Sequence, residues 1–224
     1  MQSLGKKFYS FRADANALGG FLREPFEKNI PTLAPVSLPA VGGFAMARSE
    51  AFTFDEIVTC SSAYTRVSGS EHKDGSVSIL VTAVVEGLNL LEVVTARRVV
   101  AQVSISVPTG NGPPRFSLTG SRFEGLLLAG RECRPKLNPR QEWLTHDPKS
   151  GNLLCSLIDG FEDADPVIPR GHVVEIPGFG RITLGQLLLT PDSVQLVAIR
   201  ADLGCPVSGG VTVSCVGGGG TGEN

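Results

Sequence analysis

Glycine and proline interrupt this chain roughly every ten to twenty residues, and that spacing limits what the chain can fold into. The 27 glycines and 15 prolines separate short runs rich in Val, Ile, Leu, Thr, Ser and Phe. Such runs between regular turn signals are typical of all-β proteins. The sequence therefore predicts one all-β domain over residues 1–216, an antiparallel β-sandwich or barrel of about 10–12 strands.

Two segments depart from this pattern. The segment PRQEWLTHD, residues 139–147, places a proline where a helix could begin, so we expect at most one short helix there. Residues 217–224, GGGGTGEN, form a glycine-rich segment that we expect to be a flexible tail.

The most apolar region spans residues 77–107 and begins with the run ILVTAVV. Its density of β-branched residues and its internal Gly87 favour strands over a helix. The continuous run predicts strands buried on both faces. A hairpin is expected just before it, with its turn at His72–Gly75, because Asp-Gly supplies the positive φ of a tight turn. Other strands are expected at 7–15, 17–23 and 43–54.

The phrase Glu-Gly-Leu occurs twice inside strand-like segments, at Glu86 and at Glu124. A glycine in a strand interior marks a bulge or a close backbone approach, and a bulge re-aims its neighbour. We therefore favour two bulges that carry exposed acids. The alternative is a catalytic pair, in which both carboxyls face one cavity and shift each other's pKa.

Two further residues are weak catalytic candidates. His172 alternates with Val174 and Ile176, so it could be an inward general base, although a core or rim histidine is the more frequent outcome. Tyr64 is a polar group in an otherwise apolar strand. Among the cysteines, Cys205 and Cys215 bracket a short segment and could form a disulfide, but two reduced thiols are favoured.

An acidic segment offers the one candidate for a metal. It carries four carboxylates, and hard cations such as Ca²⁺ take several oxygen ligands from one loop. The spacing does not fit a known calcium loop, so we favour a solvated acidic loop and expect no cofactor. The four residues are Asp159, Glu162, Asp163 and Asp165.

Composition excludes two classes of partner. The net charge is −2 and no long basic run occurs, which argues against nucleic-acid binding. No run reaches the ~18–20 apolar residues of a membrane span. The pair Lys6-Lys7 is not followed by the apolar block of a secretory signal. We expect a cytoplasmic protein if the start is native, and a secreted or surface protein if a signal was trimmed.

Five blocks resemble a group of uncharacterised bacterial all-β proteins that carry them in the same order. They are VGGFAMA, AYTRVSGS, VEGLNLLEVVTARRVVA, GSRFEGLLLAG and PGFGRITLG. No activity is known for that group, so the resemblance implies no site residue.

Two functional hypotheses follow. The first is a non-catalytic β-domain that self-assembles as a homo-oligomer or binds another protein, because strands apolar on both faces need cover from a second surface. The second is a barrel that binds an apolar small molecule, such as an isomerase or cyclase that uses Glu86, Glu124, His172 or Tyr64.

Overall fold

The computed structural model describes residues 8–109, 113–138, 153–161, 172–204 and 206–223. These residues form 20 strands and their connections, and none of them is helical. All of the strand pairs are antiparallel, which confirms the predicted fold class. The helix predicted at 139–147 lies outside the described residues.

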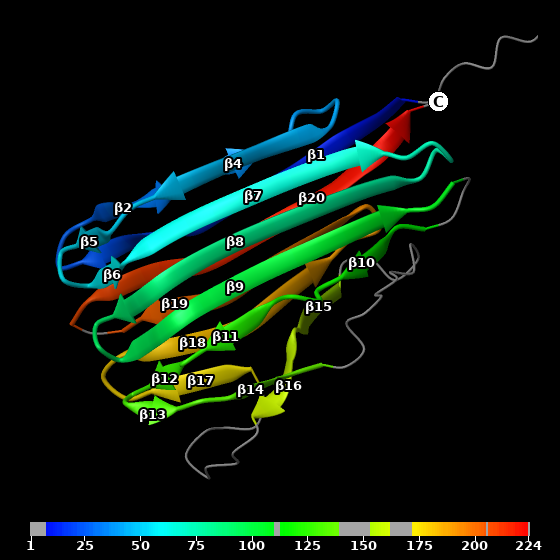
Figure 1. Ribbon diagram of the computed structural model, residues 1–224. Coiled ribbons are helices and arrows are strands. Elements are labelled where there is room, and N and C mark those ends of the chain that lie inside the picture. The colour runs from blue at the N-terminus through cyan, green and yellow to red at the C-terminus, as the bar shows by residue number, and fades with distance from the viewer. Residues whose placement is uncertain (1–7, 110–112, 139–152, 162–171, 205, 224) are drawn as a thin grey trace, which may run out of the picture.

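Most strands belong to two sheets that lie one behind the other (Figure 1). Sheet A has eight strands. Its main path is β15 (Leu153–Ser156), β18 (Gly180–Leu189), β19 (Ser193–Leu203), β20 (Ser208–Glu223), β1 (Phe8–Glu24) and β2 (Lys28–Leu33). Two short strands, β17 (Val173–Ile176) and β3 (Val36–Ser37), pair with β18 and β1.

Sheet B has ten strands, and its centre is β7 (Ser62–Glu71), β8 (Val77–Leu90) and β9 (Val94–Val107). On one side lie β4 (Gly43–Ser49), β5 (Phe52–Phe54) and β6 (Val58–Cys60). On the other lie β10 (Arg115–Ser117), β11 (Arg122–Glu124), β12 (Leu127–Leu128) and β13 (Arg131–Glu132). A separate pair joins β14 (Pro135–Leu137) to β16 (Ile158–Phe161).

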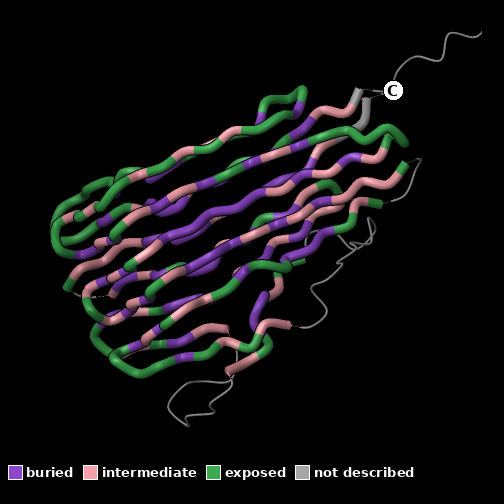
Figure 2. Tube along the Cα trace, viewed as in Figure 1, coloured by how far each residue is buried: buried purple, intermediate pink, exposed green. Residues whose placement is uncertain are grey.

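The two sheets form a sandwich, because β1 and β20 of sheet A pack against β8 and β9 of sheet B. Buried side chains from both sheets, such as Leu18, Ile79 and Ile199, occupy the space between them. Figure 2 shows buried positions running along the middle of the long strands, with exposed positions at their ends and at the sheet edges.

Several strand boundaries differ from those expected. Residues 7–15 and 17–23 were expected as two strands, but β1 runs through both of them. Residues 43–54 were expected as one strand and divide into β4 and β5. The predicted total of 10–12 strands was too low, because two-residue edge strands such as β12 carry no recognisable alternation. The hairpin turn at His72–Gly75 is confirmed between β7 and β8.

Partway along each long strand, the buried side chains change from one face of the strand to the other. The inward residues of β8 are first odd-numbered and then even-numbered: Val77, Ile79, Val81, Ala83 and Val85, followed by Leu88 and Leu90. The change falls at Gly87, whose φ is +60°. The apolar run ILVTAVV, residues 79–85, lies before this change. Its inward residues alternate regularly, and Thr82 and Val84 on the other face are buried as well, so burial on both faces is found from Val81 to Val85 but not at Leu80, which is half-buried.

This switch occurs along one line across each sheet, which we call the crease. In sheet B the crease passes through Ser61, Gly87, Arg97 and Gly125, and pairing continues in unchanged register on both sides of it. In sheet A it passes through Gly185, Ala198, Ser214, Ala17 and Ala34. Alternate strands have a residue with positive φ there: +60° at Gly125, +62° at Gly185, +51° at Ser214 and +47° at Ala34.

Near the crease, two buried hydroxyls donate hydrogen bonds to backbone carbonyls that face the interior. The Oγ1 of Thr65 in β7 donates to the carbonyl of Ala34 in the opposite sheet at 2.6 Å. The Oγ of Ser214 in β20 donates to the carbonyl of Val99 in β9 at 3.5 Å. Because Thr65 and Ser214 are both fully buried, these hydrogen bonds satisfy groups that water cannot reach.

The expectation of a flexible glycine tail is wrong for residues 217–223. They belong to β20, which lies between β1 and β19 in the middle of sheet A. A Cβ at Gly218 would lie 2.8 Å from the Cδ1 of Ile105 in the facing sheet. A Cβ at Gly219 would lie 2.2 Å from the carbonyl oxygen of Asp192. Glycine is needed here for close packing, which a composition argument cannot detect.

Among the described residues there is no helix with the length and apolar content needed to cross a membrane.

Candidate functional site

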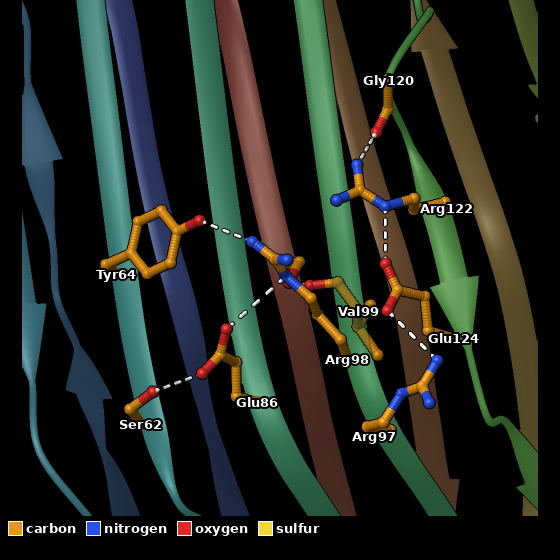
Figure 3. A network of polar contacts seen from close by, with 10 residues as sticks. Ser62, Tyr64, Glu86, Arg97, Arg98, Val99, Gly120, Arg122 and Glu124 are labelled. Carbon is orange, nitrogen blue, oxygen red and sulfur yellow. Dashed lines mark hydrogen bonds and ion pairs between the residues drawn. The ribbon is translucent and has the colours of Figure 1, made fainter.

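The largest polar network that the sequence candidates form lies on the outer face of sheet B (Figure 3). Strand register places Ser62, Glu86, Arg98 and Glu124 in one row across β7, β8, β9 and β11. Tyr64 lies two residues after Ser62 in β7, on the same face. Strand register therefore makes three of the four predicted catalytic candidates neighbours, and the two glutamates belong to the repeated Glu-Gly-Leu phrase.

Glu86 is held from both sides. Ser62 Oγ donates to Glu86 Oε2 at 3.1 Å, and Arg98 Nε lies 3.6 Å from Glu86 Oε1. The same guanidinium donates from Nη2 to the hydroxyl of Tyr64 at 2.9 Å. Arg98 therefore links β9 to both β8 and β7. The hydrogen bond to Tyr64, together with the nearby carboxylates, raises the pKa of Arg98 above its ordinary value.

Glu124 is bound by two other arginines. Arg122 Nε donates to Glu124 Oε1 at 2.7 Å, and Arg97 Nη2 donates to Glu124 Oε2 at 3.4 Å. The hydrogen bond from Arg122 is the main reason that the pKa of Glu124 lies below its ordinary value. Arg122 also donates to the carbonyl of Gly120 at 3.1 Å, which fixes the start of β11.

Glu86 and Glu124 border one shallow depression of about 410 Å³, together with Ser61, Arg97 and Arg98. A general acid at neutral pH needs a raised carboxyl pKa, whereas the pKa of Glu124 is lowered. Arg98 lies between the two acids and pairs with Glu86. The arrangement is a charge network that links four strands beside the crease, and it does not give Glu124 the environment of a proton donor.

His172 does not join this network. It directly precedes β17 at one side of sheet A, and its carbonyl accepts a hydrogen bond from the amide of Leu184 at 2.8 Å. The network lies on the outer face of sheet B, so the sandwich separates the two.

The acidic segment is only partly described. Asp159 lies in β16 and is exposed, whereas Glu162, Asp163 and Asp165 lie outside the described residues. Within the described ranges, no group of three or more His, Cys, Asp or Glu side chains could hold a metal ion. Cys205 also lies outside these ranges. Cys215 is a free cysteine, and the favoured interpretation of two reduced thiols stays a prediction. Burial raises the pKa of the Cys215 thiol.

Sequence analysis missed the arginines of this network. None of Arg97, Arg98 and Arg122 was a candidate there. The available signal was the pair Arg122 and Glu124, which lie two apart on one strand and share a face. The cross-strand partners depend on register, which the sequence did not supply.

The fold defines the class of this protein as an antiparallel β-sandwich domain. The chain belongs to the family described as a domain of unknown function (DUF8256), whose model matches residues 8–149 and 139–190. Membership agrees with the resemblance to an uncharacterised group, and the bacterial origin stays a prediction. No curated protein and no solved structure matches the chain.

Proposed function

We propose that this domain is a non-catalytic β-module that self-assembles through the free edge of β4. The observation that carries the proposal is an exposed, unprotected strand edge with large apolar side chains. β4 pairs with β7 on one side, and no other described strand pairs with its second side. Figure 1 shows β4 along the border of sheet B.

The outer face of β4 is unusually apolar for an exposed strand. Phe44 and Met46 are each 58% exposed and point to the same side, because they are two positions apart. Val41, just before the strand, is 90% exposed. A contiguous exposed apolar surface next to unpaired backbone groups favours the addition of another strand.

The other sheet borders carry the protections that usually prevent such pairing. β2 contains Pro31 and begins with Lys28, and β15 and β17 have four residues each. β12 and β13 have two residues each. Proline, lysine and short length all weaken an edge as a template for another strand. β4 has seven residues and contains neither proline nor lysine.

The charges of β4 favour an antiparallel pair of two copies related by a two-fold axis. An axis at Met46 sets Phe44 of one copy opposite Arg48 of the other, where a guanidinium can lie over the ring. The two Arg48 side chains then lie about 13 Å apart along the strand direction, four residues at ~3.3 Å each. A parallel pair would place them side by side, where like charges repel. The antiparallel pair would join two copies of sheet B into one continuous sheet.

The hypothesis of an apolar ligand inside the sandwich has less support. Glu86, Glu124 and Tyr64 lie on the outer face of sheet B, and His172 lies at one side of sheet A. Side chains from both sheets fill the interior near the crease.

Sedimentation velocity of three variants tests the proposal. The wild-type chain should form dimers in a concentration-dependent way. Met46→Lys and Met46→Glu should each be monomeric, because each places like charges opposite one another at the axis. An equimolar mixture of the two should dimerise again. Leu154→Lys, a change at an exposed apolar position in β15 of sheet A, is the control and should leave the dimer intact.

A wild-type chain that stays monomeric over the whole concentration range would contradict self-assembly through β4. Dimers that persist in both Met46 variants would show that another surface joins the copies.

A further inference from the structure

A pocket lies at the end of the sandwich where β1 turns into β2, away from both the β4 edge and the arginine network. Its volume is about 550 Å³, within the ~300–1,000 Å³ of small-molecule sites. Leu22, Ile57 and Val207 contribute an apolar floor, and Leu22 and Ile57 are buried there. Phe26 stands at the pocket and is 72% exposed. The site therefore offers apolar surface without a partner from the described residues.

Two strained turns form one wall of this pocket. Asp55 and Glu56 connect β5 to β6 with φ of +45° and +55°. Leu91 and Glu92 connect β8 to β9 with φ of +50° and +58°. Two consecutive positive φ angles are the signature of a tight turn that normally uses Asn-Gly, Asp-Gly or Gly-Gly, so Asp55 suits its position whereas Glu56, Leu91 and Glu92 do not. Neither turn contains asparagine or glycine.

The two turns are joined to each other. The amide of Leu91 donates to the carbonyl of Ile57 at 2.9 Å, so the strained segments form one unit. Four of the seven non-glycine residues with positive φ among the described residues border this single pocket. Such strain persists where the surrounding structure enforces it, and it concentrates at ligand-binding sites.

The charges at the pocket are unbalanced. Lys28 is the one cation among the lining residues and forms an ion pair with Asp55. Glu56 and Glu92 have no such counterpart among the residues that line the pocket. Both residues are exposed and line the pocket together with the apolar residues, so their negative charge disfavours an anionic ligand and favours a cationic one.

We propose that this pocket binds a small amphiphilic cation, with its apolar chain on the floor formed by Leu22, Ile57 and Val207 and its ammonium group beside Glu56 and Glu92. The strained turns hold these two carboxylates at the rim of the pocket. The proposal is independent of assembly through β4.

Titration with alkylammonium ions of increasing chain length, at concentrations where they stay monomeric, tests the site. Methyl resonances of Leu22, Leu91 and Val207 should shift in a saturable way, and affinity should rise with chain length. Alkyl sulfates of equal length are the matched probe and should bind several-fold more weakly. Equal binding of both head groups would overturn the charge argument, and the absence of saturable shifts at these methyls would overturn the site.

Variants separate the apolar and the charged parts of the site. Val207→Trp fills the pocket and should abolish binding, whereas Val41→Trp, at an exposed position elsewhere, should not alter it. Glu92→Gln should weaken alkylammonium binding roughly two- to fivefold, the loss of one exposed ion pair. Unchanged affinity in Val207→Trp would refute the proposal.

The Met46→Lys variant, expected to be monomeric, should bind the alkylammonium ion as the wild type does. This result distinguishes failure of the pocket proposal from failure of the assembly proposal.

Glu92→Gly separates stability from binding, because a turn with a purely architectural role would gain stability without losing affinity for the ligand. Glycine adopts positive φ without strain, so the melting temperature should rise. Affinity for the alkylammonium ion should fall, because the carboxylate is gone. A gain in stability with no loss of affinity would contradict a binding role for this turn.

Discussion

Gly87 of β8 and Gly125, which follows β11, lie on either side of Arg97 of β9, and both have a φ of +60°. Each is the glycine of a Glu-Gly-Leu phrase, and the two mark where the crease crosses sheet B. The phrase is therefore a structural device that switches the buried face of a strand without shifting its register. The acids before the two glycines are brought near each other as a consequence.

Gly87→Ala should destabilise the protein by about 2–4 kcal/mol. The new Cβ adds the strain of positive φ and would lie 2.7 Å from the Oγ of Ser61. Gly130→Ala is the matched control, because Gly130 also has positive φ but has open space around its Cβ position. It should cost only about 1 kcal/mol. Urea denaturation of both variants measures the difference, and equal losses would show that close packing at Gly87 contributes nothing.

Thr65→Val should destabilise the fold by about 1–3 kcal/mol, because the carbonyl of Ala34 loses its buried donor while side-chain volume is kept. Thr82→Val is the opposite case. The Oγ1 of Thr82 is buried without a hydrogen-bond partner among the described residues, so its replacement should be neutral or stabilising. Thermal denaturation compares the two. A stabilising Thr65→Val would contradict the role assigned to hydroxyls at the crease.

Asp14→Asn should stabilise the protein at neutral pH and have little effect in acid. Partial burial raises the pKa of the Asp14 carboxyl in the folded chain, so the folded state holds its proton to a higher pH than the unfolded chain does. Stability therefore falls as the pH rises from the unfolded pKa through the folded one, and asparagine removes this loss.

Asp74→Asn is the companion measurement and should show the reverse. The hydroxyl of Ser76 is the main cause of a lowered pKa at Asp74, so its contribution is present above the unfolded pKa and is lost in acid. Melting temperatures of each variant, measured below the unfolded-state pKa of aspartate and at neutral pH, test the Asp14 and the Asp74 prediction. Parallel behaviour of the two variants would contradict the assigned causes.

Gly218→Ala should cost about 1–3 kcal/mol, because the new methyl would crowd Ile105 of the facing sheet. Combining it with Ile105→Val should recover part of that loss, so the two changes should be non-additive in a double-mutant cycle. A flexible glycine tail would instead tolerate Gly218→Ala with no change in stability.

The fold class and one hairpin could be predicted from local chemistry. Asp74-Gly75 fixes a turn through its own backbone preferences. The glycines within β8 and after β11 correctly marked irregular positions, but the predicted bulges are wrong, because the register is unchanged there and only the buried face changes. Two short strands, β12 and β13, contain too few residues to show a pattern. The glycines of β20 were misassigned, because their role depends on Ile105 and Asp192, residues remote in sequence.

The candidate site was only partly predictable for a similar reason. The position of each glutamate before a glycine was visible, but the partners of Glu86 and Glu124 come from neighbouring strands. Positive φ at Leu91, Glu92 and Glu56 contradicts the usual preferences of those residue types, so no local rule could have indicated the pocket that they border.

The central position of β20 also determines when the protein can finish folding. β1 is made before β20, and the hydrogen bond from Thr212 to the carbonyl of Gly19 joins positions 193 residues apart. Until β20 has been synthesised, β1 and β19 each lack a neighbour in sheet A. Contacts between such distant segments slow folding. A nascent chain must therefore keep two long apolar strands from pairing with other molecules until its last glycine-rich strand arrives between them.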